Sequence, residues 1–356
     1  MLERAWRMMG AVILLVAGWP MPLHAQPGVT LHADVLLYGD NTEFRNPFRE
    51  GETLFGGAVR LWTGLEPNDR VTVSLGVLTN GRFGSGDAFE LVRPIVSLTV
   101  RSGGSSFLIG TLPRRPVPEG PDLGSPHGLL PGLQRETLSF ERPHEAGLQW
   151  TFAGTRLRHD AWLNWQRLNT PSHRERFDAG AIGEFRVNRL IAVPWQFHLV
   201  HEGGQQFASG PVADSYAGGP GVLVRRAGTA RVTASIEAHA LVSRFVPDRS
   251  TPDRSRTGAA FFGRAVVGAS GWRGHVIFWR GDDFIKDEGD PNYQSRRRDG
   301  TRYRGIRDYA EAGVAKTFHV APDVALQASA RIHRVERHYE YSYRILASTH
   351  FRWRIR

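Results

Sequence analysis

The sequence predicts a single all-β domain, a membrane-spanning antiparallel β-barrel of about sixteen strands, with fourteen to eighteen left open. Three observations predict it: apolar and polar residues alternate along many segments, several of these segments are longer than ordinary strands, and short and long connections follow one another in turn. The 356 residues include 40 Gly, 19 Phe and 10 Trp, and 22% are charged. This composition excludes a disordered chain and a coiled coil.

The alternation is clearest just after residue 144. Ala146, Leu148 and Trp150 lie on one face of a strand, and the residues between them lie on the other. A wall between lipid and water requires such an apolar and such a polar face. A soluble sandwich also alternates, but several of these segments exceed the five or six residues of a globular strand. The same pattern recurs in Arg156–Gln166, Arg176–Val187, Thr229–Ser243 and Tyr341–Ile355.

The connections fall into two alternating classes, seven short and eight long, which implies sixteen strands with both chain ends on the periplasmic side. A further strand at Glu136–Glu141 would raise the count. The short connections are expected near Glu66–Asp69, Ser102–Ser105, Ala153–Gly154, Asn188–Ile191, Ala227–Gly228, Ala269–Gly271 and Val320–Asp323. The long ones are expected near Gly39–Gly51, Thr79–Asp87, Pro113–His144, Gln166–His173, Glu202–Tyr216, Phe245–Arg256, Gly281–Arg302 and Arg334–Glu340.

The N-terminus has the order of a secretory signal peptide. Arg4 and Arg7 precede the apolar run Gly10–Gly18, and small-residue cleavage is expected after Ala25. The apolar run is too short to span a bilayer. We therefore expect a signal peptide at residues 1–25 and an outer-membrane barrel at residues 26–356, in a Gram-negative cell.

The exported chain is basic and rich in arginine. Its net charge is +10, and it contains no Cys and only two lysines, Lys286 and Lys316. Loss of Glu3, Arg4 and Arg7 with the signal peptide would leave +9. Outside the cell interior we expect no nucleic acid as a partner, but rather small anionic solutes and the phosphates of outer-membrane lipid and lipopolysaccharide.

The signal, the long strands, the absence of Cys, the arginines on inner faces and the long third outer loop together resemble a bacterial general or substrate-specific porin. The stretch Leu112–Trp150 is also similar to uncharacterised bacterial porin-like proteins. The resemblance implies insertion by the barrel assembly machinery and leaves a homotrimer open. Such barrels usually end in an aromatic residue, whereas this chain ends in Arg356, although the alternation from Tyr343 to Ile355 is intact.

In porins the third long loop folds into the lumen and narrows it. The resemblance therefore implies that charged residues of Pro113–His144 form a pore constriction: Arg114, Arg115, Glu119, Asp122, Arg135, Glu136, Glu141 and Arg142. Strand parity adds inward-facing residues that would line the pore: Arg101, Arg156, Arg158, Asp160, Trp162, Arg186, Arg231, Arg331, Arg344 and Arg352. The arginine excess predicts anion preference. Any single arginine is more often paired with a carboxylate or with lipid phosphate.

Three other features have an ordinary structural interpretation beside a functional one. Trp62, Trp150, Trp165, Trp195, Trp272, Trp279 and Trp353 are expected to anchor strand ends at the membrane interface, whereas Trp162 points inward and would stack on a sugar or fill the lumen. The acidic run Gly281–Asp290 could hold a divalent cation, but its spacing fits no EF-hand and a solvated loop is favoured. His198 and His201 face opposite sides of one strand, which argues against shared ligation.

These observations favour a passive channel for small hydrophilic, anionic solutes over an enzyme. The sequence contains no HExxH or GxSxG motif, no GxGxxG at a strand-to-helix junction and no cysteine, so we expect no catalytic residue, no cofactor and no metal. Two alternatives remain. One is a substrate-specific channel or exporter for acidic saccharides, which the arginines and Trp162 would also suit. The other is an outer-membrane lipid hydrolase, for which the sequence nominates no residue.

Overall fold

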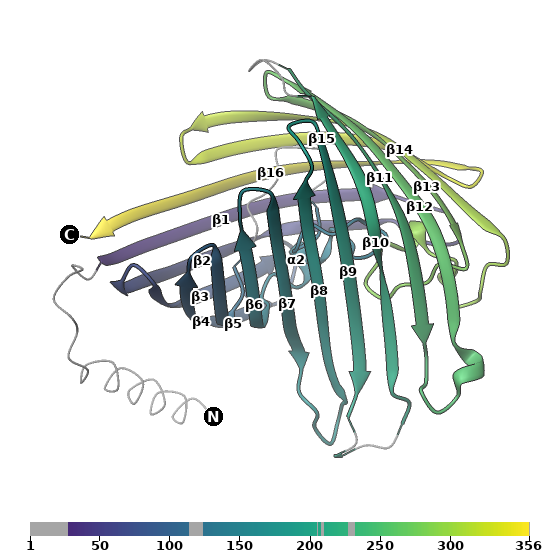
Figure 1. Ribbon diagram of the computed structural model, residues 1–356, viewed down its shortest axis with the longest axis horizontal. Helices are drawn as coiled ribbons and strands as arrows, with labels where there is room; N and C mark the ends of the chain where they lie inside the picture. Colours follow the sequence, from purple (N-terminus) through teal and green to yellow (C-terminus); the bar gives the residue numbers. More distant parts are fainter. Residues whose placement is uncertain (1–27, 114–123, 205, 208–209, 227–231, 356) are drawn as a thin grey trace.

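The computed structural model describes residues 28–113, 124–204, 206–207, 210–226 and 232–355, and within them sixteen antiparallel strands close into one barrel (Figure 1). The predicted fold class and strand number are confirmed. The strands are β1 Gly28–Glu43, β2 Glu52–Asn68, β3 Val71–Arg82, β4 Leu91–Ser102, β5 Ser105–Thr111, β6 Ala146–Ala153, β7 Leu157–Arg167, β8 Glu175–Arg186, β9 Ile191–Gly203, β10 Ala213–Arg226, β11 Val232–Val246, β12 Arg256–Ala269, β13 Trp272–Asp282, β14 Ile306–Ala321, β15 Val324–Val335 and β16 His338–Ile355.

The first and last strands close the barrel. They pair from Val29 opposite Ile355 to Glu43 opposite Tyr341, and every other strand pairs with its neighbours in sequence. Closure leaves no sheet edge, so the ladder hydrogen bonds of the wall are satisfied within the chain. The last strand, β16, thus completes the wall up to Ile355, the last residue that the structure describes.

The outer face of the wall is apolar. Leu37, Phe55 and Ile109 each expose about half of their surface, whereas their sequence neighbours Leu36 and Leu54 are buried in the interior. This is the alternation that the sequence predicted, because successive strand residues point to opposite faces. No helix among the described residues is both long and apolar enough to cross a membrane.

Most connections lie where they were expected. The last one, predicted to be long at Arg334–Glu340, is instead a short turn, because β15 ends at Val335 and β16 begins at His338, so the alternation of short and long connections fails there. β1 and β3 extend to Glu43 and Arg82, into segments predicted to be loops, because their ladder pairing continues there. The stretch Glu136–Glu141 adds no strand and instead contains the short helix α2, Leu138–Glu141. The expected signal peptide and the predicted turn at Ala227–Gly228 lie outside the described residues.

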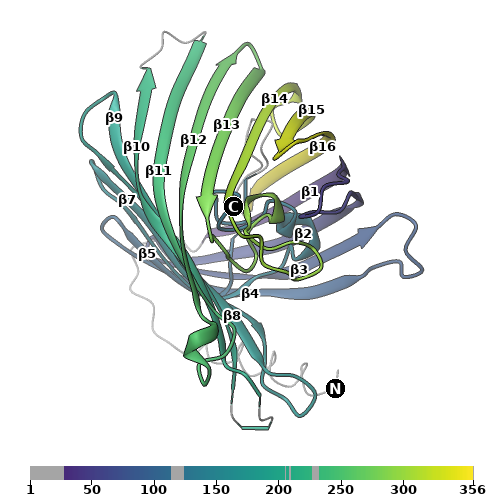
Figure 2. The ribbon, with the colours of Figure 1, turned by 90° about the vertical axis from the view of Figure 1, so that its right-hand side faces the viewer.

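Two connections between strands fold into the barrel rather than away from it. We call residues 124–145, between β5 and β6, the first lumen loop, and residues 283–305, between β13 and β14, the second lumen loop. α2 belongs to the first loop, and the short 3-10 helix η2, Pro291–Tyr293, belongs to the second. Figure 2 shows both within the ring of strands, whereas the 3-10 helix η1, Pro252–Arg254, lies outside it.

The lumen loops give the barrel an apolar core in the half that carries the long connections. Leu129, Leu130 and Leu133 of the first loop join Phe284 and Tyr293 of the second, and all five are buried. A barrel of this size would otherwise enclose an aqueous channel. The wall side chains in the same cluster are Trp162, Ala217, Leu241, Phe262, Ile277, Trp279, Tyr309 and Val335.

Candidate functional site in the barrel lumen

Backbone and side-chain hydrogen bonds fix the first lumen loop against the wall and against the second loop. The amide of Leu130 donates to Gln196 Oε1 of β9 at 2.7 Å. The amide of Arg135 donates to the Glu288 carbonyl at 2.7 Å, and that of Asp290 donates to the Pro131 carbonyl at 2.8 Å. The two loops therefore form one unit inside the barrel.

Glu136 is the charged centre of this unit. Its carboxylate forms ion pairs with Arg331 of β15 and, at 3.0 Å, with Arg344 of β16. Arg344 also pairs with Asp40 at 2.7 Å, and Arg331 lies 3.8 Å from Glu311. Burial opposes the charge on Glu136, but the two guanidinium groups outweigh it and hold the pKa of this carboxyl well below its usual range. Arg331 and Arg344 thus point into the lumen, where carboxylates already match their charge.

The other residues proposed for the constriction have separate partners. Arg135 pairs with Glu141 at 2.5 Å within the first loop, and Arg142 pairs with Glu288 of the second loop at 2.7 Å. Each of these contacts joins opposite charges, so none leaves a free arginine facing a solute. Arg114, Arg115, Glu119 and Asp122 lie outside the described residues.

Trp162 points into the lumen, where both its indole N–H and its aromatic ring already have partners within the chain. Its indole Nε1 donates to Asp178 at 3.1 Å. The His127 imidazole of the first loop stacks on the ring with centroids 3.7 Å apart and planes 6° apart. A sugar could stack on that face only after His127 had moved.

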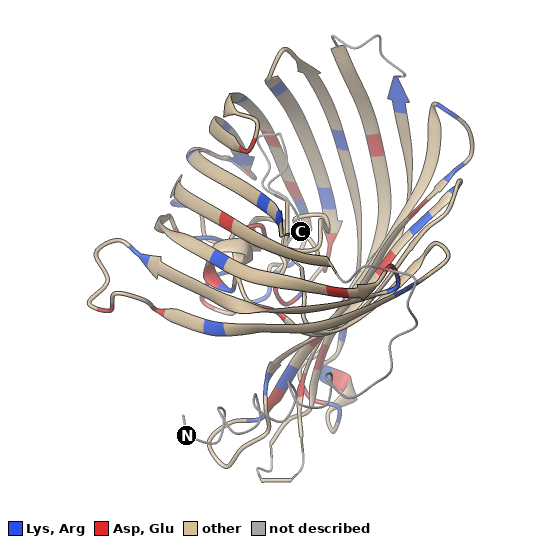
Figure 3. Ribbon diagram, turned by 90° about the vertical axis from the view of Figure 1, so that its left-hand side faces the viewer, with Lys and Arg blue, Asp and Glu red and all other residues tan. Residues whose placement is uncertain are grey.

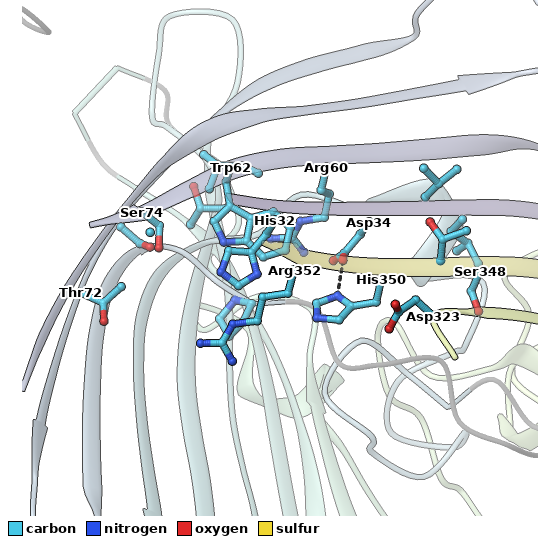
Figure 4. A pocket seen from close by; sticks show the side chains of 18 of the residues that line it. His32, Asp34, Arg60, Trp62, Thr72, Ser74, Asp323, Ser348, His350 and Arg352 are labelled. Carbon is cyan, nitrogen blue, oxygen red and sulfur yellow. Dashed lines mark hydrogen bonds and ion pairs between the residues drawn. The ribbon is translucent and has the colours of Figure 1, made fainter. Parts of the chain in front are cut away.

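The half of the lumen nearest the short turns is open. It forms a vestibule with a volume of about 860 Å³, lined in part by Arg60, Arg101 and Arg352. Figure 4 shows Arg60 and Arg352 there. None of the three forms an ion pair with a described residue. Arg101 donates to Thr72 Oγ1 at 2.8 Å, and Arg60 donates to the Leu112 carbonyl at 3.3 Å. Short turns lie on the periplasmic side of outer-membrane barrels, so the vestibule faces the periplasm.

An aromatic pair lies beside these arginines. The imidazole of His32 stacks on Trp62 with centroids 4.6 Å apart, and the Arg60 guanidinium lies 5.7 Å from the Trp62 ring centroid. Carboxylates line the vestibule too, and that of Asp34 pairs with His350. Basic and acidic positions are indeed intermixed around the whole barrel (Figure 3). Three carboxylates, those of Asp34, Glu66 and Asp323, thus line the same cavity as the three arginines.

The remaining residues proposed to line the pore lie toward the short-turn end of β7 and β8. Arg158 and Asp160 are on β7, where Asp160 accepts from Gln149 at 2.9 Å. Arg156 precedes β7 in a turn, and Arg186 ends β8. Arg231 lies outside the described residues.

Two of the tryptophans predicted to be interfacial anchors are not. Trp279 is fully buried against the two loops, and Trp62 faces the vestibule. Their strand parity places them inside, and proximity to a strand end in sequence misled the prediction. Trp150, Trp165, Trp272 and Trp353 are about half exposed on the outer face, as interfacial anchors require.

Two features of the site were missed by sequence reasoning. Arg60 shares its strand parity with Trp62, a signal that could have placed it in the vestibule. A chain of polar groups also crosses three adjacent strands: Ser342 Oγ lies 2.8 Å from His333 Nε2, and His333 Nδ1 lies 3.3 Å from Glu311 Oε2. No spacing motif could reveal this chain, because its members come from β14, β15 and β16.

Comparison with known proteins adds to this geometry. A family model described as lipid A 3'-O-deacylase-type matches residues 23–356. The chain belongs to this family. No curated protein matches the sequence.

Several solved structures have the same fold as this chain, although their sequences are only 7–12% identical to it. OmpT of Vibrio cholerae, in its trimer form, superimposes with a TM-score of 0.56 at 9% identity, covering 92% of this chain and 100% of that one. The anion-selective porin from Comamonas acidovorans gives 0.53 at 7%, covering 92% and 100%. OccK8 (OprE) of Pseudomonas aeruginosa gives 0.52 at 12%, covering 91% and 98%. The chain is a porin-like β-barrel of the outer membrane.

Proposed function

We propose that this barrel is a channel for small anionic solutes, with its binding site in the periplasmic vestibule and its width set by the two lumen loops. The observation that carries the proposal is the set of three arginines, Arg60, Arg101 and Arg352, that line the 860 Å³ cavity without a carboxylate partner among the described residues. Unpaired guanidinium groups in a narrow lumen attract anions and repel cations.

The burial of Arg60 strengthens this argument. Its residue surface is only 8% exposed, and its Nε has no hydrogen-bond partner among the described residues. A guanidinium presents five donors in a rigid fork that fits carboxylate or phosphate groups. An anion bound in the vestibule beside Arg60 would satisfy this unused donor.

The test is ion selectivity of the refolded mature protein in planar bilayers. We expect an anion-selective reversal potential under a salt gradient for the wild type, and a large loss of that selectivity for the double variant Arg101→Gln/Arg352→Gln. Both side chains are exposed enough for the barrel to fold without them. Arg254→Gln, on η1 outside the barrel, is the matched control and should leave the selectivity unchanged. Equal selectivity in the wild type and the double variant would refute the proposal.

A second candidate function is lipid ester hydrolysis, which the family description favours and for which the structure offers a chain of residues. Ser342 and His333 have the order of nucleophile and base, and Nδ1 of His333 lies 2.8 Å from the Tyr309 hydroxyl, which donates to Glu311 at 2.5 Å. Arg331 donates to Ser342 Oγ at 3.2 Å and would favour the ionised form of this nucleophile. The first lumen loop covers this group, so a substrate would have to displace Glu136.

Mass spectrometry of lipid A after incubation with the refolded barrel tests this second candidate. Loss of one acyl chain in the wild type and in Ser348→Ala, but not in Ser342→Ala, would support it. Intact lipid A with all three proteins would exclude it. Saturable block of the conductance by an acidic saccharide would instead favour the substrate-specific channel or exporter.

The proposed oligomer is a homotrimer, as one structural neighbour is described in a trimer form. Chemical cross-linking of the protein in native outer membranes should then yield a band at three times the monomer mass. A monomer band alone at saturating cross-linker would refute it.

A further inference from the structure

Three side chains from distant parts of the sequence converge behind the second lumen loop. Asp178 of β8, His198 of β9 and Glu288 of the loop each direct one ligand atom toward the others, and these atoms lie within 4.8 Å of one another. We propose that this group binds a divalent transition-metal ion of the Zn²⁺ type. One imidazole nitrogen and two carboxylate oxygens are ligands that such ions accept.

The hydrogen bonding of His198 defines which ring nitrogen is free. Its Nδ1 lies 3.1 Å from the Leu133 carbonyl oxygen, and a carbonyl can only accept, so Nδ1 carries the hydrogen. In the neutral ring Nε2 then has a lone pair, and it faces Asp178 Oδ2 at 3.3 Å and Glu288 Oε2 at 3.9 Å. Three lone-pair donors face one another here. Metal-binding histidines typically donate their other nitrogen to a backbone carbonyl in this way.

Glu288 supplies an independent observation. Its Oε1 accepts hydrogen bonds from Arg142 at 2.7 Å and Arg176 at 3.2 Å, but its Oε2 has no hydrogen-bond partner among the described residues. The side chain is only 4% exposed. A buried carboxylate oxygen without a partner is costly, and a cation at this point would satisfy it.

The backbone of Glu288 also holds the carboxylate in place. Its φ is +68°, the left-handed conformation that residues with side chains rarely adopt. The amide of Arg135 in the first loop donates to the Glu288 carbonyl at 2.7 Å and secures this conformation. The contact between the two loops thus holds the Glu288 backbone in the position from which its side chain reaches Asp178 and His198 on the barrel wall.

The spacing of the group fits a tetrahedral ion with little movement. Metal–ligand bonds of about 2.0–2.1 Å place neighbouring ligands about 3.3 Å apart. The pair formed by His198 and Asp178 is already at 3.3 Å, so mainly the Glu288 carboxylate must approach. Trp162 and Asn164 donate to Asp178 at 3.1 and 2.7 Å and would orient that ligand from outside the site.

The rival occupant of this position is a proton. A doubly protonated His198 would donate Nε2–H to Asp178, and Glu288 Oε2 would still have no hydrogen-bond partner among the described residues. The positive charges of Arg142, Arg176 and the buried Lys286 weaken cation binding to some extent. Both arginines, however, contact Oε1 rather than the free Oε2, and the Lys286 ammonium donates to the Asp287 carbonyl at 2.5 Å. A direct measurement of metal binding therefore distinguishes a bound metal ion from a proton on His198.

The experiment is Zn²⁺ titration of the chelator-treated, refolded, tag-free barrel by isothermal titration calorimetry, with the bound metal counted by mass spectrometry. We expect one equivalent of Zn²⁺ per chain in the wild type. Glu288→Gln keeps the shape of the side chain and should weaken binding by at least about tenfold. His198→Gln should do the same.

The control is Glu202→Gln, which removes a carboxylate that also pairs with Arg176, at 2.9 Å, but that lies outside the group. It should bind Zn²⁺ like the wild type. Circular dichroism and heat-dependent gel mobility verify that each variant is folded. Absence of stoichiometric binding in the folded wild type, or equal binding in Glu288→Gln and the wild type, would overturn the proposal and favour the proton. The result is independent of whether the barrel conducts ions.

Discussion

Replacement of Glu136 by Gln should release the first lumen loop from the barrel wall. The change removes the charge that pairs with Arg331 and Arg344, both less than one-tenth exposed. Breaking a buried ion pair costs about 3–5 kcal/mol. Each arginine keeps a second carboxylate, Glu311 or Asp40, so we expect the lower end, about 3 kcal/mol. That is roughly a hundredfold shift in the docking equilibrium of the loop.

The assay is single-channel conductance, with Glu141→Gln as the matched control. Glu141 lies on the same loop and pairs with Arg135, but both side chains are partly exposed, so this ion pair contributes at most about 1 kcal/mol. Glu136→Gln should therefore increase the conductance or the open probability, and Glu141→Gln should leave both nearly unchanged. Identical conductance in the two folded variants would show that Glu136 does not hold the loop.

The pH dependence follows from the same ion pairs. Because the folded pKa of Glu136 lies well below its unfolded value of about 4.3, its stabilising contribution is complete above the unfolded value and is lost only as the pH falls through the folded pKa. The conductance of the wild type should be constant between about pH 8 and pH 5 as far as this group is concerned. An increase in conductance within that range that Glu136→Gln abolishes would contradict the assignment.

The remaining predictions concern the contacts of the second lumen loop. Arg49→Gln removes the buried ion pair with Asp290 and should destabilise the loop by about 3 kcal/mol. Its control is Arg298→Gln, which should cost less than about 1 kcal/mol because the partner, Glu50, is exposed. Limited proteolysis measures the difference, and equal susceptibility of the two variants would contradict it. A Cβ on Gly289 would overlap the Gly132 carbonyl oxygen, so Gly289→Ala should separate the two loops and raise the conductance. Gly86→Ala meets no atom within 4 Å and should match the wild type.

The wall of the barrel could be predicted because each strand is specified by residues that are close together in the sequence. Each strand needs only an alternation of apolar and polar residues and a turn at its end, and both can be identified in the chain from Ala146 to Ile355. The exposed outer residues Leu148 and Trp150, and the buried inner residue Trp162, follow from this parity alone. Strand ends were less certain, since the pairing of β1 continues beyond the predicted limit at Gly39.

The contents of the lumen were decided by the tertiary structure. That Glu136 would meet Arg331 and Arg344, some 200 residues away in sequence, depends on the closure of β1 on β16 and on the direction in which the loop folds. For the same reason the acidic run Gly281–Asp290, predicted as a solvated loop, instead places Glu288 beside His198 and Asp178. The sequence by itself determined the sixteen-strand wall through its residue periodicity, whereas the partners of the inward-facing charges became defined only when the barrel closed around the loops.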